Sequence, residues 1–127
     1  MSDVIRPAKS PDAASVEWPR HGLCVVRLTG DLDLAVAPQL TRYLREQTST
    51  GVDHLVLDLA QVRFLASAGI GVILTAMSNA EGIRGRLHLT GVTDNHVVAR
   101  VLDLCSLLPR LDIHERLDEL LDRPDHN

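Results

Sequence analysis

Ser67 is a single hydroxyl placed among small residues, where an apolar strand gives way to an apolar helix. Ala66 and Ala68 flank it, and Gly69 and Gly71 follow in what we predict to be the first turn of that helix. A serine at this point is a preferred N-cap. The same hydroxyl could carry a phosphate, because the amino end of a helix has free N–H groups and the positive end of the helix dipole.

Capping does not explain the two glycines, Gly69 and Gly71. Each glycine inside a helix costs about 0.5–1 kcal/mol relative to alanine. Close approach of another backbone offsets this cost, and that backbone belongs either to this chain or to a docking partner. The segment from Ala66 to Ile70 is therefore a candidate contact surface.

An acidic pair follows a different predicted strand. Asp31 and Asp33 come after the predicted strand 23–30, and Ser67 comes after the predicted strand 53–60. If these strands are neighbours in a parallel sheet, their carboxyl ends meet at one edge. A phosphate on the serine, with a charge of about −1.5 to −2, would then repel the two carboxylates. The alternative for both aspartates is ordinary turn chemistry.

Other chemistry-bearing residues give weaker signals. A receiver domain with a phosphoaspartate at Asp58 and a magnesium ion is disfavoured, because the only lysine is Lys9, near the start of the chain. Ser67 also lacks the G-x-S-x-G elbow of a hydrolase. The histidines show no H-x-x-x-H spacing, so we predict surface or strand-edge positions and no metal site. They are His21, His54, His88, His96, His114 and His126.

The two cysteines, Cys24 and Cys105, do not form a C-x-x-C pair. In a reducing compartment we predict two buried, inert thiols. A redox-sensing pair is the alternative, because the spacing alone does not say whether the two sulfur atoms meet in space.

The elements that must position these residues alternate along the chain as β-β-α-β-α-β-α-β-α. This order predicts an α/β fold with a mixed, mostly parallel sheet of four to five strands, packed with about four helices. The predicted strands lie near 16–18, 23–30, 53–60, 86–90 and 110–114, and the predicted helices begin near Pro38, near Ala68, after a capping Asp94, and at Glu115.

Length and composition indicate one folded domain with an aliphatic core. The 127 residues suit a single domain, which we place at 16–122, between a flexible arm at 1–15 and a disordered tail at 123–127. The net charge of −4 and the 2% aromatic content argue against nucleic-acid binding. No apolar run suggests a membrane span or a signal peptide, so we expect a cytoplasmic protein.

Three segments resemble the STAS domain, the fold of bacterial anti-sigma factor antagonists. They are "LTGDLDLAVAPQL", "HLVLDLAQVRFLASAGIGVIL" and "HVVARVLDLCSLLPRLDIH", and the likeness runs from about Leu23 to Leu121. The family element G-[DE]-[LIV]-D falls on residues 30–33, and the serine that the family phosphorylates falls on Ser67. The resemblance covers most of the chain and combines two separate motifs.

This resemblance implies a regulator of transcription that is not itself an enzyme and holds no cofactor. It would bind an anti-sigma factor with serine-kinase activity and release a sigma factor, which it affects only indirectly. The kinase, which holds ATP and magnesium, would inactivate it by phosphorylating Ser67, and a serine phosphatase would restore it. The residues implied in partner binding are Asp31, Asp33, Ala66, Ser67, Ala68, Gly69 and Ile70.

The chain departs from the family pattern at Ala66, where the family usually has an acidic residue before the serine. The missing carboxylate weakens kinase recognition or marks a member that works without phosphorylation. One alternative function is therefore a phosphorylation-independent interaction module, which either lacks a switch or is regulated through Cys24 and Cys105. Another is a sensor that holds a nucleotide or a lipid head group at the start of the Ser67 helix.

Overall fold

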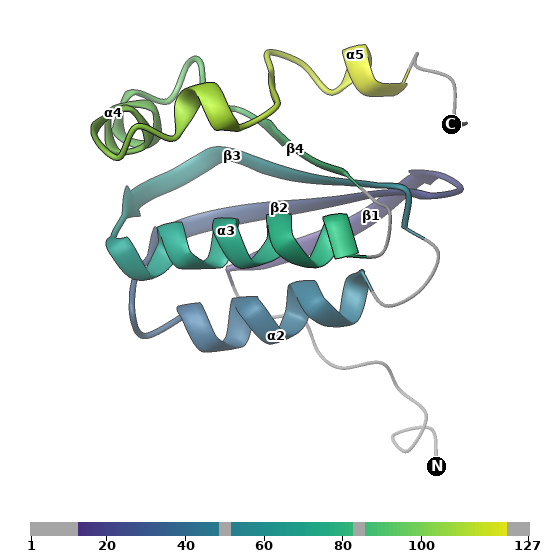
Figure 1. Cartoon of the computed structure of the whole chain (residues 1–127), viewed down its shortest axis with the longest axis horizontal. Coiled ribbons are helices and arrows are strands. Elements are labelled where there is room, and N and C mark those ends of the chain that lie inside the picture. The colour runs from purple at the N-terminus through teal and green to yellow at the C-terminus, as the bar shows by residue number, and fades with distance from the viewer. Residues whose placement is uncertain (1–12, 49–51, 83–85, 122–127) are drawn as a thin grey trace.

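Five strands form one mixed sheet in the order β1-β2-β3-β4-β5 (Figure 1). The computed structural model describes residues 13–48, 52–82 and 86–121. β1 pairs with β2 in the antiparallel sense, and the other neighbouring pairs are parallel. The strands are β1 (Ala14–Arg20), β2 (Leu23–Leu32), β3 (His54–Leu65), β4 (Arg86–Thr90) and β5 (Ile113–His114).

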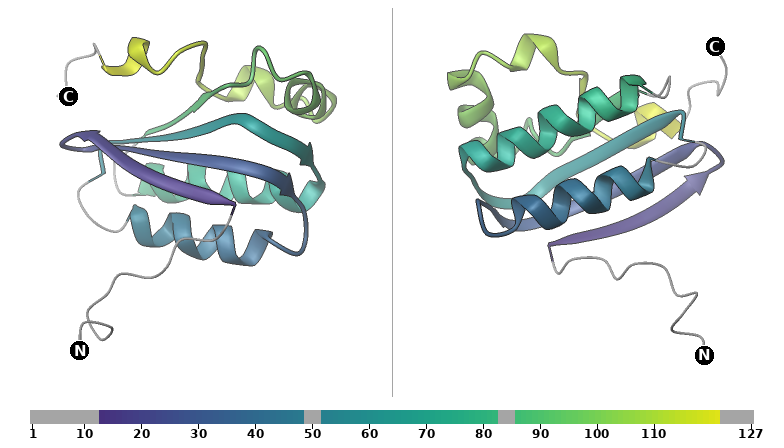
Figure 2. Two further views of the ribbon diagram at one scale, coloured as in Figure 1. Left: turned by 180° about the vertical axis from the view of Figure 1, so that it is seen from behind. Right: turned by 60° about the horizontal axis from the view of Figure 1, so that its bottom comes forward.

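The helices lie on both sides of this sheet. α2 and α3 run side by side beneath it, whereas α4 and α5 lie on the opposite side (Figures 1 and 2). The described helices are α2 (Ala37–Gln47), α3 (Ser67–Gly82), α4 (His96–Leu104) and α5 (Asp118–Leu121), with a short 3-10 turn, η1 (Leu108–Arg110), between α4 and β5. The predicted mixed, mostly parallel sheet with about four helices is confirmed.

Two groups of buried side chains hold the layers together. The larger core includes Leu28, Leu57 and Ile73 and extends to α4 through Val98. The smaller one lies on the face under α5 and consists of Leu23, Val25, Val56 and Leu120. Aliphatic residues dominate both clusters, as the low aromatic content predicts, and their burial is the main favourable term in folding.

Several element ends differ from the prediction. β3 continues five residues beyond the predicted end at Ala60, whereas β5 is only two residues long and α5 begins three residues later than Glu115. β1 begins at Ala14, two residues inside the predicted arm. Residues 1–12 of that arm, and the predicted tail, lie outside the described residues.

Candidate partner-binding site

The carboxyl ends of β2 and β3 bring the acidic pair and the serine to one edge of the sheet. These strands are parallel neighbours, and Leu32 lies opposite Leu65 in their register. The backbone N–H of Ala66 donates a hydrogen bond to the carbonyl oxygen of Leu32 over 3.1 Å. We call the seven residues at this edge the docking rim: Asp31, Asp33, Ala66, Ser67, Ala68, Gly69 and Ile70.

Ser67 is the first residue of α3 and not its cap. The backbone N–H of Ile70 donates to the carbonyl oxygen of Ala66 over 3.0 Å, so Ala66 holds the capping position. The interpretation of Ser67 as an N-cap is therefore wrong. Its side chain is exposed. Within the described part of the chain, its hydroxyl makes no hydrogen bond, so it is accessible and uncommitted.

The two glycines of α3 have different surroundings. A Cβ atom added to Gly69 would lie 2.6 Å from the carbonyl oxygen of Leu32 and 2.7 Å from a methyl carbon of Leu65. A Cβ atom added to Gly71 would meet nothing within 4 Å, and this glycine is exposed. Close packing within the chain therefore explains Gly69, whereas Gly71 leaves an open surface beside Ser67.

The two aspartates of the docking rim also differ. The Oδ1 atom of Asp33 accepts hydrogen bonds from the backbone N–H groups of Ala35 and Val36, at 3.1 and 3.3 Å, which fixes the turn into α2. Asp31 is exposed, and its Oδ1 atom lies 4.0 Å from Nε of Arg63 in a solvent-exposed ion pair. Asp33 therefore has a structural role, and Asp31 is the more available carboxylate.

Two exposed apolar side chains lie beside the docking rim, and sequence reasoning missed both. Leu34 is 77% exposed and Phe64 is 51% exposed. Phe64 lies opposite Asp31 in the β2–β3 register. A large exposed side chain is informative when it adjoins other candidate contacts. The signal for Phe64 was available, because it is the only phenylalanine in a chain with an aliphatic core.

A surface hollow of about 430 Å³ lies at the start of α4 and not at Ser67. Residues 60–63 and 94–97 line it. Asn95 connects its two sides, because its side-chain amide donates to the carbonyl oxygens of Leu59 and Val62 while its Oδ1 atom accepts from Val98. Asn95, and not the predicted Asp94, therefore caps α4. The hollow gives no support to a ligand held at the start of the Ser67 helix.

Asp58 has partners within the sheet. Its Oδ1 atom accepts a hydrogen bond from the backbone N–H of Ala60 over 3.1 Å, and its Oδ2 atom lies 3.3 Å from Nε of Arg27. β3 continues past Asp58 to Leu65, so this carboxylate does not stand at a strand end. Asp58 therefore has a structural role inside the sheet, and the expectation that it lies near a strand end is wrong.

The two cysteines lie in unlike environments and are not bonded to each other. Cys24 is fully buried in the larger core, whereas Cys105 is exposed at the end of α4. The prediction of two buried thiols is therefore wrong for Cys105. Burial raises the pKa of the Cys24 thiol to about 12, so this thiol is protonated and unreactive at neutral pH.

One group of polar side chains is buried away from the docking rim, on the face of the sheet under α5. It contains His88 in β4 and His114 in β5, both buried, together with Asp112. The prediction of surface or strand-edge positions is wrong for His88, because β4 lies between β3 and β5.

In the part of the chain that the structure describes, no helix has the length and apolar character of a membrane span.

The family is established by a match over most of the chain. The family model described as "STAS domain" matches residues 17–120, so the chain belongs to the STAS domain family. The anti-sigma F factor antagonist of Paenibacillus polymyxa is 29% identical over 102 residues, which are 79% of this chain and 86% of that protein. An anti-sigma-B factor antagonist of Staphylococcus epidermidis is 23% identical over 71% of this chain and 82% of its own length.

Solved structures agree with this assignment. The anti-sigma factor antagonist SpoIIAA in its unphosphorylated form has a TM-score of 0.74 and 24% identity, over 87% of this chain and 95% of that chain. An anti-sigma factor antagonist from Mycobacterium paratuberculosis has a TM-score of 0.70 and 24% identity, over 90% of this chain and 96% of that one. These likenesses confirm the fold predicted from the sequence.

Proposed function

We propose that this protein is an anti-sigma factor antagonist whose docking rim binds an anti-sigma factor with serine-kinase activity. Binding releases a sigma factor, and phosphorylation of Ser67 ends the interaction. A serine phosphatase then restores the binding form. The observation that carries this proposal is an exposed serine hydroxyl at the first position of a 16-residue helix, free of hydrogen bonds to any described residue.

The surface around Ser67 suits a protein partner. Gly71 leaves open space one turn along the same helix face, and Leu34 and Phe64 offer exposed apolar area. Aromatic side chains in such positions contribute strongly to protein interfaces. The exposed carboxylate of Asp31 adds a charge that a basic partner surface could recognise.

A phosphate on Ser67 would be stable on this protein but unsuited to the interface. The amino end of α3 favours an anion, and the first turn of α3 contains no acidic residue to oppose it. The added charge of about −1.5 to −2 and the added volume would cover the surface that Gly71 leaves open. The same modification thus fits the helix end and blocks a partner that docks closely.

The relatives named above support the first half of the proposal, since they are called anti-sigma factor antagonists. SpoIIAA has been solved in unphosphorylated and phosphorylated forms, which supports a phosphorylation switch. The antagonist itself performs no catalysis in this scheme. ATP and magnesium belong to the partner kinase.

Ala66 favours a second candidate function, a STAS module that binds its partner without a phosphorylation switch. The family's usual carboxylate is absent there, and Ala66 is half-buried with its N–H already bonded to Leu32. A kinase would have to recognise Ser67 without that charge. The two functions share the docking rim and differ only in whether Ser67 is modified.

The test is capture of partners from a lysate of the native cell, with wild type and Ser67→Asp as baits and mass spectrometry as the readout. We expect wild type to retain an ATPase with kinase activity and Ser67→Asp to lose it by at least about 100-fold in affinity, as for loss of an interface hot spot. Incubating the captured kinase with ATP should add one phosphoryl group to wild type and none to Ser67→Ala.

Ser78→Asp is the matched control, because Ser78 is exposed on the same helix but far from the docking rim in sequence. It adds the same charge and should bind as wild type does. Equal capture by wild type and Ser67→Asp, without phosphoryl transfer, would replace the switch by the phosphorylation-independent module. Loss of capture in Ser78→Asp as well would show that charge on α3, and not the position of Ser67, controls binding.

A further inference from the structure

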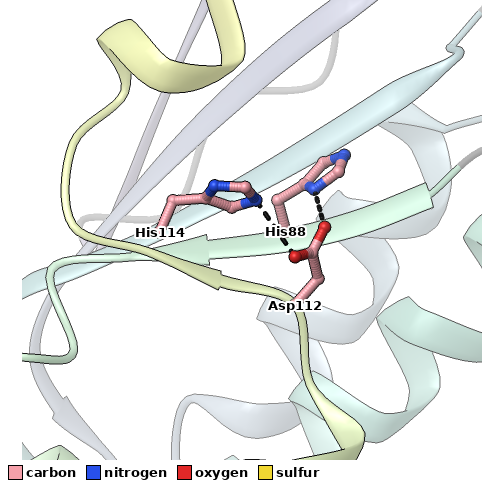
Figure 3. Close-up of side chains that lie close together, drawn as sticks. All are labelled: His88, Asp112 and His114. Carbon is pink, nitrogen blue, oxygen red and sulfur yellow. Dashed lines mark hydrogen bonds and ion pairs between the residues drawn. The ribbon is translucent and has the colours of Figure 1, made fainter.

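Two buried histidines and two exposed carboxylates connect β4, β5 and α5, away from the docking rim. Nδ1 of His88 lies 2.6 Å from Oδ2 of Asp112, and Nε2 of His114 lies 3.1 Å from Oδ1 of the same carboxylate (Figure 3). His88 is fully buried and His114 is 8% exposed. The two rings thus point at one carboxylate from two neighbouring strands.

Each histidine has a second polar neighbour on its other ring nitrogen. Nε2 of His88 lies 3.0 Å from Nδ1 of His54, at the start of β3. Nδ1 of His114 lies 3.3 Å from Oε1 of Glu119 in α5. This is the arrangement found around metal-binding histidines, where the nitrogen that does not bind the metal donates a hydrogen bond to a carboxylate or another acceptor.

The surroundings of His114 leave one ring nitrogen unsatisfied when the ring is neutral. With the proton on Nδ1, the ring donates to Glu119, and the lone pair on Nε2 faces the Asp112 carboxylate. With the proton on Nε2, the lone pair on Nδ1 faces the Glu119 carboxylate. Among the described residues, the buried Nε2 of His114 makes no well-aligned hydrogen bond, although it lies 3.1 Å from Oδ1 of Asp112. A positive charge between this nitrogen and Asp112 removes the conflict.

We propose that His88, Asp112 and His114 form a binding site for a divalent transition-metal ion, with zinc as the best fit. One ligand atom from each residue lies within 4.8 Å of the other two. Ligands about 2.1 Å from a tetrahedral zinc ion are about 3.4 Å apart, so side-chain movements of about 1 Å complete the site. Two imidazoles and one carboxylate are a donor set that zinc accepts.

The exposure of the three residues also fits a metal ion. The side chain of Asp112 is 43% exposed, which gives an ion an entry path and leaves a water molecule as the fourth ligand. His54 and Glu119 would hold the orientation of the two rings from outside. When the ion binds Nδ1 of His88, the proton of that ring lies on Nε2, and this N–H donates a hydrogen bond to His54.

The ion would attach two very short elements to the sheet. β5 has two residues and α5 has four, and each contributes to the group through His114 or Glu119. Elements this short gain little from their own hydrogen bonds, and binding energy at a metal site adds directly to folding energy. The ion would therefore stabilise this end of the sheet, separate from the docking rim.

The test is titration of the full-length, tag-free, metal-free protein with zinc chloride against a chromophoric chelator. We expect one zinc ion per chain and a rise in the melting temperature. Asp112→Asn and His114→Gln should weaken binding by at least about 100-fold, and Glu119→Gln by about 10- to 100-fold. Cobalt bound to wild type should give the visible absorption of a tetrahedral site, which His114→Gln should lose.

His96→Gln is the matched control, because it removes an exposed histidine outside the group and should leave zinc affinity unchanged. Circular dichroism shows whether each variant folds. If a variant fails to fold, NMR of wild type decides the question, since zinc should shift the ring signals of His88 and His114 but not those of His96. Absence of saturable zinc binding, or equal affinity in wild type and Asp112→Asn, overturns the proposal.

Discussion

The docking rim and the histidine group use polar side chains in opposite ways. At the docking rim, the hydroxyl of Ser67 is exposed and has no partner among the described residues, and Asp31 has only a solvent-exposed ion pair. In the histidine group, His88 is buried and both of its ring nitrogens have partners. The docking rim thus leaves polar groups accessible, as the proposed partner binding requires, whereas the histidine group keeps its two rings buried beside polar neighbours of this chain.

The two regions also depend on different parts of the sequence. The docking rim comes from two short segments, 31–33 and 66–70, that follow neighbouring strands. The histidine group draws on positions 54, 88, 112, 114 and 119, which only the finished sheet brings together. Under the proposed function, local substitutions should therefore change partner binding, whereas a change in the histidine group affects several elements at once.

The largest effect we expect is a loss of stability at low pH that arises in the histidine group and not at the docking rim. Burial lowers the pKa of His88 from 6.5 to about 4; the nearby Asp112 carboxylate opposes this shift, and His54 and His114 add to it. Between about pH 6.5 and 4, the His88 side chain is therefore protonated in the unfolded chain and neutral in the folded chain. Stability is full above this pH and falls by up to about 3 kcal/mol as the pH approaches 4.

Urea unfolding between pH 7.5 and 4 in EDTA measures this loss, and NMR of the His88 ring in the folded protein locates its titration. We expect His88→Leu to reduce the pH dependence by about one proton. Ser67→Asp, at the docking rim, should leave it unchanged. A His88 ring that titrates near 6.5 would contradict the link between burial and stability.

The second effect separates Gly69, which belongs to the docking rim, from Gly71, which lies beside it on α3. Gly69→Ala places a Cβ atom 2.6 Å from the carbonyl oxygen of Leu32 and should destabilise the fold by about 1–3 kcal/mol. Gly71→Ala meets open space and should stabilise α3 by about 0.5–1 kcal/mol while weakening partner binding. Unfolding curves and partner affinity, measured on both variants, give the comparison. A stabilised Gly71→Ala protein with unchanged affinity would place the partner elsewhere.

The sequence predicted the fold, and the meeting of the acidic pair and the serine at one edge of the sheet, better than it predicted local details. Apolar runs alternating with helical periodicity indicate a mostly parallel sheet, and the carboxyl ends of neighbouring strands then meet at one edge. That reasoning places Asp31, Asp33 and Ser67 at the same edge, where the structure has them. It placed the cap of α3 one residue too late, because Ala66 can supply a backbone carbonyl to Ile70 without a side-chain cap.

The histidine group could not be predicted in the same way. His88 lies in the short run "RLHLT", where alternation suits any half-buried strand, and its partners are 24 to 34 residues away. Spacing rules for metal sites detect ligands on one helix or one turn, whereas the proposed ligands lie on β4, on β5 and in the residue before β5. The position of Asn95 was missed for a related reason, because its bonds to Leu59 and Val62 depend on β3 running past its predicted end.

A smaller effect distinguishes the two aspartates of the docking rim. Asp33→Ala removes two hydrogen bonds to the turn before α2 and should cost about 1 kcal/mol of stability. Asp31→Ala breaks only an exposed ion pair with Arg63 and should cost less than about 0.5 kcal/mol. Partner affinity should show the reverse order, with Asp31→Ala the more harmful. Equal losses of affinity would show that both carboxylates reach the partner.

The smallest effect we expect concerns the two thiols. They would control partner binding only in the alternative in which Ser67 is not the switch. Cys24 is buried with a pKa raised to about 12, and Cys105 is exposed. The reagent DTNB should therefore modify one thiol of the folded protein and two after unfolding. Because the two sulfur atoms are not bonded, Cys105→Ser and dithiothreitol should leave partner affinity unchanged. A change with either treatment would favour the thiol-regulated module, and the effect of Ser67→Asp would then have to be measured again in the reduced protein.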